Sequence, residues 1–194
     1  MLKYYYRLIT LKLLKKHNFS KANKIPTHLT LKEKIKLYEL ARQTSGKFVE
    51  VGSYLGASSC FLAMGIRDNK TNSKLFCVDT WQNDGMSEGK RDTYEEFFNN
   101  TKQFADLIYA LRGSSEEIAT QFDHRISLLF IDADHSYDKC YQDWLLWKPY
   151  LIPGSTVIFH DIGWADGVKR VVAEQVAPLA KNEDCLPNMY WATT

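Results

Sequence analysis

The sequence predicts an α/β fold in which helices cover both faces of a doubly wound, mostly parallel sheet. From Phe48 onward, apolar runs of strand length alternate with amphipathic runs of helix length. This alternation is typical of parallel sheets. Residues 126–131 are apolar at nearly every position, as expected of a central strand that is covered on both faces. The length of 194 residues fits one such domain.

The expected elements follow one another along the chain. Residues 31–44 carry apolar side chains at helical spacing and are followed by Gly46, which indicates a helix. Strands are expected at residues 48–51, 74–78, 108–111, 126–131, 156–159 and 189–193. The helices between them are expected at residues 58–66, 92–104, 115–121, 137–150 and 167–177. Pro153 and Gly154 predict a turn before the fifth strand.

The N-terminal segment is strongly basic, and we divide the chain into a leader of residues 1–30 and a domain of residues 31–194. Residues 1–32 contain eight basic residues and no acid, which leaves a net charge of −6 for the remainder. Apolar residues interleave with these charges and predict an amphipathic helix, followed by a polar linker at residues 20–30. Two interpretations stay open: a cap helix on its own domain, or peripheral contact with an anionic membrane or an acidic partner. Nothing else in the sequence indicates nucleic-acid binding.

The cysteines and the apolar runs favour a cytoplasmic protein. Cys60, Cys77, Cys140 and Cys185 are far apart and form no metal-binding pattern, and Cys60 and Cys77 lie in apolar runs typical of buried residues. A reducing compartment fits this usage. The N-terminal segment lacks the uninterrupted apolar core of a signal peptide, and no run reaches the roughly 18 apolar residues that span a bilayer.

The first predicted strand leads into a turn with two glycines, Gly52 and Gly56, preceded by Glu50. In doubly wound sheets, ligands bind beyond the carboxyl ends of the strands. Glycines at such a turn let the backbone approach a ligand and leave helix N–H groups pointing at it. The third glycine of the dinucleotide fingerprint is missing. Taken alone, the turn is equally well explained as structural.

The second and third strands also end in polar residues. Asp79 ends the second strand, where a carboxylate can accept both hydroxyls of a ribose. The alternative is an aspartate that caps its own turn. Ser114 and Ser115 follow the third strand and are expected to cap the next helix, to contact an adenine edge, or both.

Acids and histidines follow the fourth and fifth strands. Asp132, Asp134 and His135 follow the fourth strand, and His160 and Asp161 follow the fifth. Carboxylates that face one another at an open cleft repel unless a cation or a proton lies between them. Oxygen ligands with one imidazole suit Mg²⁺ or Mn²⁺. The alternative is a set of caps and surface ion pairs.

Taken together, these features resemble the class I S-adenosylmethionine (SAM)-dependent methyltransferases, which have a Rossmann-like sheet. More narrowly, they resemble methyltransferase family 24, which includes macrocin-type sugar O-methyltransferases and cephalosporin-hydroxylase-like proteins. The resemblance covers about residues 45–177. It is carried by the segments FVEVGSYLGASS (48–59), VDTWQND (78–84), LRGSSEEIA (111–119), LLFIDADHSYDKCYQDWLLWKPYLIPGSTVIFHD (128–161) and GVKRVV (167–172).

The resemblance implies a SAM site along these strand ends. In it, Glu50, Gly52 and Gly56 cradle the methionine part of SAM. Asp79 is the ribose-binding acid, and Ser114 and Ser115 are neighbours of the adenine. The cofactor residues expected in full are Glu50, Gly52, Ser53, Tyr54, Gly56, Asp79, Thr80, Trp81, Ser114, Ser115 and Asp132.

The resemblance also implies a divalent cation such as Mg²⁺ at Asp132, His160 and Asp161. Asp132 matches the first metal-binding aspartate of the catechol and caffeoyl types, and Asp161 matches a second ligand. His160 stands where the macrocin type has an acid. His135 stands where the catechol type has its catalytic lysine. A histidine can accept a proton at neutral pH, so His135 is the expected catalytic base; the alternative is an exposed residue near a helix start.

The resemblance therefore implies a SAM-dependent O-methyltransferase that acts, with the help of a divalent metal, on a hydroxyl group of a small molecule or sugar. It also implies a homo-oligomer. One alternative is a SAM-binding protein without transfer activity. It is favoured by His160 and by the short segment after Asp161, where one of the family's two last strands is expected to be missing or shortened. A nucleotide-dependent oxidoreductase is the other alternative, and its third glycine is absent.

Overall fold

A seven-stranded sheet forms the centre of the protein in the computed structural model, which describes residues 19–83 and 89–194. Its order is β3-β2-β1-β4-β5-β7-β6. The strands are β1 Lys47–Val51, β2 Lys74–Asp79, β3 Ile108–Arg112, β4 Ile126–Ile131, β5 Leu151–His160, β6 Asn182–Leu186 and β7 Met189–Thr193. Strands β1 to β5 are parallel, and β7 runs antiparallel to β5 and β6. The predicted doubly wound, mostly parallel sheet is confirmed.

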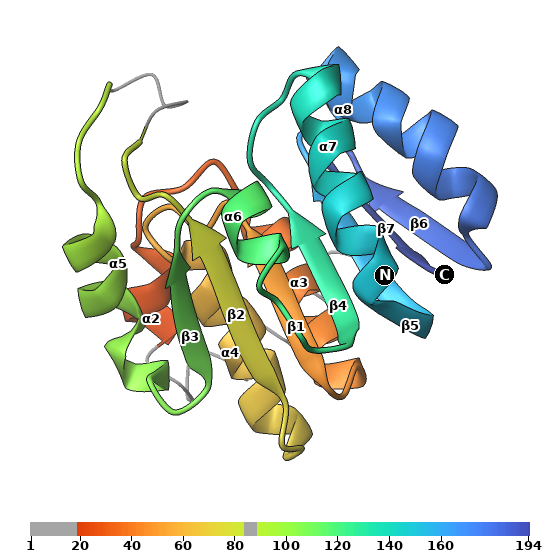
Figure 1. Ribbon diagram of the computed structural model, residues 1–194. Helices are drawn as coiled ribbons and strands as arrows, with labels where there is room; N and C mark the ends of the chain where they lie inside the picture. The colour runs from red at the N-terminus through yellow and green to blue at the C-terminus, as the bar shows by residue number, and fades with distance from the viewer. Residues whose placement is uncertain (1–18, 84–88) are drawn as a thin grey trace.

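Helices cover both faces of this sheet (Figure 1). One group, α2 Phe19–Asn23, α3 Leu31–Gln43, α4 Ala57–Asn69 and α5 Tyr94–Thr101, shares an apolar cluster with one face. The other group is α6 Ser115–Ala119, α7 Tyr137–Trp147 and α8 Asp166–Val171, and a π-helical turn, Val172–Val176, continues α8. Strand β4 is buried along its whole length because both groups cover it.

The strand order reverses between β1 and β4, and there the backbones of the two strand ends lie close together. Asp132 N donates to Val51 O across 2.9 Å, and Gly52 N donates to Val78 O across 2.9 Å. The first three βα units extend from β1 in one direction and the later ones extend from β4 in the other. A ligand site is therefore expected beyond the carboxyl ends of β1 and β4.

Two expectations at the C-terminal half are wrong. Pro153 and Gly154 do not end in a separate turn but lie within β5, where the pairing with β4 shifts from Ile126 opposite Leu151 to Leu128 opposite Thr156. This bulge accommodates the proline without a ladder hydrogen bond. The family's last strand is not missing either, because β6 and β7 are both present with five residues each.

Residues 20–30 are not a free linker. Phe19 and Ala22 of α2, with Ile25 and Leu29 after it, are buried in the cluster that holds α3 and α4. The predicted leader helix lies in residues 1–18, outside the described residues, and the division at residue 30 stays a prediction. Among the described residues, no helix has the length and apolar character needed to cross a membrane.

Helix α3 begins with a capping box. Thr30 Oγ1 accepts from Glu33 N, and the Glu33 carboxylate accepts from Thr30 N at 2.6 Å. This cap fixes Glu33, which is 2% exposed, beneath the carboxyl end of β5. The α3 start therefore contributes an acid to the same end of the sheet as the predicted site.

Candidate active site

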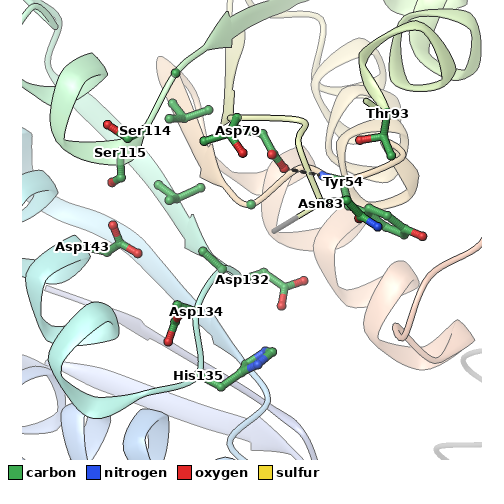
Figure 2. A pocket seen from close by; sticks show the side chains of 16 residues that line it. Tyr54, Asp79, Asn83, Thr93, Ser114, Ser115, Asp132, Asp134, His135 and Asp143 are labelled. Atoms are coloured by element: carbon green, nitrogen blue, oxygen red, sulfur yellow. Dashed lines mark hydrogen bonds between the residues drawn. The ribbon is translucent and has the colours of Figure 1, made fainter. Parts of the chain in front are cut away.

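A pocket of about 250 Å³ lies beyond the carboxyl ends of β1 to β4 (Figure 2). Its position agrees with the strand-order reversal. Its walls come from the turns that follow four strands and from helix α7. The lining residues are Val51, Gly52, Tyr54, Val78, Asp79, Thr80, Asn83, Thr93, Gly113, Ser114, Ser115, Asp132, Ala133, Asp134, His135 and Asp143.

A second, smaller pocket of about 70 Å³ adjoins the first. The two share Gly52, Tyr54, Asp132, Ala133 and His135. The smaller pocket adds Asp161, Ser53 and the loop of residues 26–28. The glycine turn after β1 and the tip of β4 therefore separate a larger chamber from a smaller one, with Asp132 and His135 facing both.

The turn after β1 needs glycine at position 52. Gly52 has φ +87°, and a Cβ placed there would lie 2.1 Å from the carbonyl oxygen of Asp132. That distance is far below van der Waals contact, so only glycine lets the β1 turn and the β4 tip approach this closely. Gly52 lines the pocket wall, and the predicted approach of its backbone to a ligand stays a prediction.

Asp79 holds the glycine turn in place. Its Oδ2 accepts from the backbone N–H groups of Ser53 and Tyr54 at 2.9 and 2.8 Å, and its Oδ1 accepts from Trp81 N at 2.7 Å. The carboxylate also lines the larger pocket. The position of Asp79 is compatible with both interpretations. Its carboxylate accepts hydrogen bonds from the neighbouring turns, and it also lines the larger pocket, where a ribose could bind.

Several residues around the pocket have unusual backbone conformations. Tyr54, Trp81, Asn83 and Asp161 have φ between +45° and +62° although none is glycine. Such conformations cost about 1–3 kcal/mol each and gather at functional sites, where surrounding contacts enforce them. Here the enforcing contacts include the three hydrogen bonds to Asp79.

Of the two serines after β3, Ser114 has the predicted capping role, and contact of either serine with adenine stays a prediction. Ser114 caps α6 in a second capping box, in which its Oγ accepts from Glu117 N at 3.2 Å. Ser115 Oγ accepts from Trp147 Nε1 at 2.8 Å. Both serines line the larger pocket, and Figure 2 shows them on the same side of it as Asp143.

Three predicted cofactor residues line neither pocket. Glu50 is fully buried, where its carboxylate accepts from the Ser59 hydroxyl and from Cys77 Sγ at 3.2 Å. Burial raises the pKa of Glu50. Trp81 is also fully buried, and its Nε1 donates to Tyr54 O at 2.9 Å. Gly56, at the start of α4, is the third. All three residues lie around the glycine turn after β1 but outside the two pockets.

Asp132, His135 and Asp161 form a cluster in which one ligand atom from each lies within 4.8 Å of the others. His135 Nε2 lies 2.8 Å from Asp161 Oδ2, and the His135 ring packs against the exposed Trp164 at 4.7 Å. Trp164 Nε1 in turn donates to Asp161 Oδ1 at 2.7 Å. Among the described residues this is a group with the composition of a divalent-cation site.

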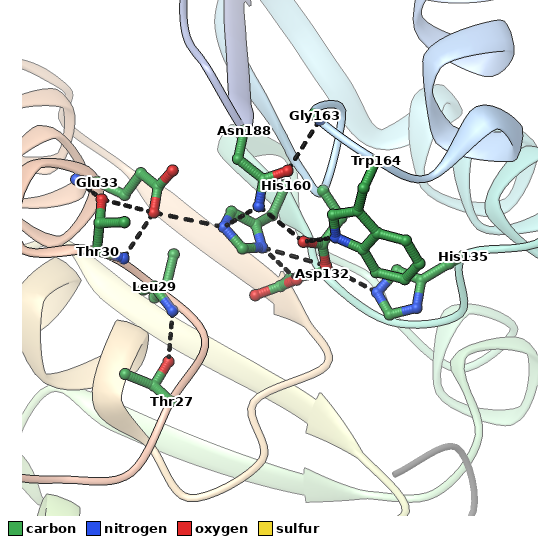
Figure 3. Close-up of polar contacts among 11 residues, drawn as sticks. Thr27, Leu29, Thr30, Glu33, Asp132, His135, His160, Gly163, Trp164 and Asn188 are labelled. Atoms are coloured by element: carbon green, nitrogen blue, oxygen red, sulfur yellow. Dashed lines mark hydrogen bonds and ion pairs between the residues drawn. The ribbon is translucent and has the colours of Figure 1, made fainter. Parts of the chain in front are cut away.

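His160 occupies a different position from the one expected of a metal ligand. It is 2% exposed and lies between Glu33 and the two aspartates (Figure 3). Its Nδ1 lies 3.1 Å from Asp132 Oδ1 and 3.3 Å from Asp161 Oδ2, and its Nε2 lies 3.6 Å from Glu33 Oε2. Both ring nitrogens of His160 have carboxylate partners and His160 lines neither pocket, whereas His135 lines both pockets together with Asp132.

Charge sets the protonation of these groups. Burial lowers the pKa of His160, but the charge of Asp132 and hydrogen bonds with Asp132, Asp161 and Glu33 outweigh it, so that its pKa lies well above the ordinary 6.5. Burial raises the pKa of Asp161, but hydrogen bonds from His135 and His160 bring it far below its ordinary value. The hydrogen bond to Asp161 raises the pKa of His135. His160 is therefore a buried cation at neutral pH.

The sequence interpretation missed Asp143, Glu33 and Asn188. Asp143 lines the pocket from α7, and Asn188 donates from its side chain to Asp161 Oδ1 at 2.8 Å. A signal for Asp143 was available, because it lies on the face of α7 that also buries Cys140, Trp144 and Trp147. An acid on an apolar helix face requires a partner or a ligand. Glu33 and Asn188 carry no comparable local signal.

The sheet order and the pocket define the protein as a member of the class I methyltransferase fold class. A family model described as "Methyltransferase domain" matches residues 49–162, and the chain belongs to this family. The O-methyltransferase NovP has 16% identity and a TM-score of 0.72 over 86% of this chain and 81% of that chain. The O-methyltransferase TomG of Streptomyces achromogenes, solved with SAM, has 18% identity and a TM-score of 0.64 over the same shares.

A curated relative matches part of the chain. An uncharacterized protein of Sinorhizobium fredii, y4gI, is 28% identical over 117 residues. The match covers 59% of this chain and 13% of the relative. The chain therefore corresponds to a small part of that protein, and the similarity supports the domain and not a whole-protein activity.

Proposed function

We propose that the protein transfers a methyl group from SAM to a hydroxyl group of a small molecule or sugar. One observation carries the proposal: the larger pocket joins the glycine turn, Asp79 and Ser114–Ser115 to a smaller chamber through shared Asp132 and His135. The larger chamber has the residues that a nucleoside and an amino acid require. His135, which lines both chambers, supplies a side chain that can accept a proton.

SAM, when bound, supplies an electrophilic methyl group on a sulfonium that leaves readily. The chain's own residues then have two tasks: to hold the cofactor and to position the acceptor. The Gly52 turn offers backbone close to the ligand, and Asp79 offers a carboxylate to the ribose hydroxyls. Positioning alone accounts for a large part of such rate accelerations, since aligned reactants reach effective molarities of about 10⁵ M or more.

His135 is the residue we assign to proton transfer. Its side chain is 39% exposed, and its Nε2 faces Asp161. Asp161 orients the ring and stabilises its protonated form, as the raised pKa of His135 indicates. The neutral imidazole accepts the hydroxyl proton, so activity is expected to rise with pH until His135 is deprotonated. The acceptor enters the smaller chamber beside residues 26–28.

As an alternative to proton transfer by His135, we propose that Asp132, His135 and Asp161 hold a divalent cation, in which case His135 is a ligand and not the proton acceptor. Two carboxylates and one imidazole are a donor set that Mg²⁺ or Mn²⁺ accepts. A bound cation would lower the pKa of a coordinated hydroxyl group. His160 remains protonated behind the two aspartates and keeps them in position. In this proposal His135 takes the place of His160, the ligand expected from the sequence.

The direct test is calorimetric titration of the purified protein with SAM, with and without Mg²⁺, followed by a radiolabelled methyl-transfer assay over a panel of phenols and sugars. We expect sub-millimolar SAM binding and transfer to at least one hydroxyl acceptor. No SAM binding in this range would end the cofactor assignment. SAM binding with no transfer to the panel would support the alternative of a SAM-binding protein without activity.

Replacing Asp79 with alanine is expected to weaken SAM binding by at least about 100-fold. The loss combines two hydrogen bonds from the ribose to a charged acceptor, at about 1.5–3 kcal/mol each. Calorimetry measures the dissociation constant. Asp92→Ala is the matched control, because Asp92 is 59% exposed and pairs with Arg112 at the surface. Equal affinities for the Asp79 and Asp92 variants would contradict the ribose assignment.

Metal affinity is expected to increase with pH, by about tenfold per unit, until His135 is deprotonated. A cation must displace the proton that Asp161 stabilises on His135, and one proton leaves for each ion bound. Mn²⁺ titrations at several pH values, in buffers of different ionisation enthalpy, measure both quantities. Asp161→Asn should abolish binding, whereas His124→Gln, which changes a half-buried histidine, should not. A pH-independent affinity would exclude His135 as a ligand.

Peripheral membrane contact and self-association stay proposals. The basic residues that motivate the first lie mostly in residues 1–18, outside the described part of the chain. Sedimentation with vesicles that contain anionic lipid tests the first, and sedimentation velocity tests the second.

A further inference from the structure

Asp143 is a buried acid in the wall of the larger pocket. It is 7% exposed and comes from the middle of α7, two turns from the Asp132–His135 cluster at the start of that helix. Figure 2 shows its carboxyl group directed at the pocket beside Ser115. The proposed methyl transfer assigns no role to Asp143.

A buried carboxyl without a cation is costly, so its retention needs an explanation. Burial raises the pKa of Asp143 to about 6, and a hydrogen bond from Ser115 opposes this. The Ser115 hydroxyl accepts from Trp147 Nε1 at 2.8 Å, which leaves its own hydrogen for Asp143. The carboxyl group is thus oriented by α6 and α7 and keeps its remaining acceptor positions for the pocket.

The position of Asp143 identifies which part of a nucleoside it would meet. Asp79 follows β2 and lies in the middle of the row of strand ends, with Gly52 and Asp132 on the β1–β4 side and Ser114–Ser115 on the β3 side. A ligand whose ribose is at Asp79 and whose reacting end is at Asp132 must place its base toward Ser115. Asp143 closes that side of the pocket.

We infer that Asp143 selects adenine by accepting a hydrogen bond from its 6-amino group. This inference rests on the proposed function, because it assumes that a SAM-type nucleoside occupies the pocket. A fixed acceptor pairs with an exocyclic amine and repels the 6-oxo group of hypoxanthine, whose lone pairs would face it. Sites built around such a polar group reject the analogue that lacks the matching donor.

Asp134 is the other acid on this wall, and its surroundings make it the weaker choice. Its Oδ1 accepts from Ser136 N at 2.8 Å and from Ser136 Oγ at 2.6 Å, so that it shapes the turn before α7. It is exposed, whereas Asp143 is buried. Discrimination between bases needs a group that water cannot replace, and Asp143 meets this condition.

The test compares S-adenosylhomocysteine with S-inosylhomocysteine, which differs in the base alone. We expect the wild-type protein to bind the adenine compound about tenfold or more tightly, as one hydrogen bond to a charged acceptor predicts. Asp143→Asn should reduce this ratio to about one, because the new amide donates to the 6-oxo group. Asp143→Leu should weaken the adenine compound and also remove the preference. Binding is measured by calorimetry, after thermal melting confirms that each variant is folded.

Two controls sharpen the comparison. Glu116→Gln removes an acid on α6 that bonds Gln142 on α7 and lies outside the pocket lining, and it should keep the wild-type ratio. Asp134→Asn should keep it too. If Asp134→Asn changed the affinity ratio and Asp143→Asn did not, the inference would be overturned and the proposed function would still stand. If the wild-type protein bound neither compound, the proposed function and the inference would both be overturned.

Discussion

Replacing Gly52 with alanine is expected to abolish measurable SAM binding and to lower the free energy of unfolding by several kcal/mol. The added Cβ would lie 2.1 Å from the Asp132 carbonyl oxygen and 2.6 Å from its carbonyl carbon. Both atoms are backbone, so the clash cannot be relieved by a side-chain rotation. Either the turn after β1 or the tip of β4 must move.

Movement at this point affects both chambers. The turn that begins at Gly52 carries the Ser53 and Tyr54 N–H groups that hold Asp79. The β4 tip carries Asp132 and, three residues later, His135. We therefore expect the alanine variant to lose SAM affinity by more than 100-fold, a larger change than its stability loss alone would produce.

Gly154→Ala is the matched control. Gly154 has a similar φ of +85°, and a Cβ there would meet nothing within 4 Å. The Gly154→Ala variant therefore carries only the cost of placing alanine in a left-handed conformation, about 1–2 kcal/mol, and has no steric clash. Urea unfolding and SAM calorimetry on both variants separate strain from steric exclusion. Full SAM affinity in Gly52→Ala would mean that the close approach of β1 and β4 is not needed for the site.

The parallel core of the fold could be predicted from the sequence because its signals are local. Strand β4 is apolar throughout, and the helices on either side repeat apolar residues every three to four positions. Strand β6 could not be predicted in this way. Its segment Asn182–Leu186 is exposed at every position but the last and begins with three polar residues, and only pairing with β7 makes it a strand.

The sequence predicts which strand ends form the candidate site, but it does not predict the directions in which the side chains there point. Gly52, Asp79 and Asp132 come together because they follow neighbouring parallel strands, which the alternating pattern already implied. The position of His160 depends on Asp161, which pairs with its Nδ1 at 3.3 Å and has a left-handed backbone at φ +62°. It also depends on Glu33, which reaches His160 from a helix more than 120 positions earlier.

His160→Leu is expected to lower the free energy of unfolding by about 3–5 kcal/mol at neutral pH, because it leaves buried carboxylates without their counter-charge. The His160 side chain is 1% exposed, and Glu33 and Asp161 beside it are 3% and 8% exposed. His160→Gln should lose nearly as much, since an amide retains a hydrogen bond but not the charge. His124→Gln, at a half-buried histidine whose ring packs against Phe76 and Phe122, should lose only about 0.5–1.5 kcal/mol.

The pH dependence of this loss distinguishes a buried cation from simple packing. The folded-state pKa of His160 is raised, so its contribution to stability is complete below the ordinary value of 6.5 and is lost as pH rises toward the folded value. The pKa of Asp161 is lowered, so its contribution is present above the ordinary 3.8 and is lost as pH falls through lower values. The difference between wild type and His160→Leu should therefore be largest between about pH 4 and 6.5 and should shrink on either side. Urea unfolding at pH 5.5, 7.5 and 9.5 measures it, and a difference that stayed constant over this range would show that His160 stabilises the protein by packing and not by its charge.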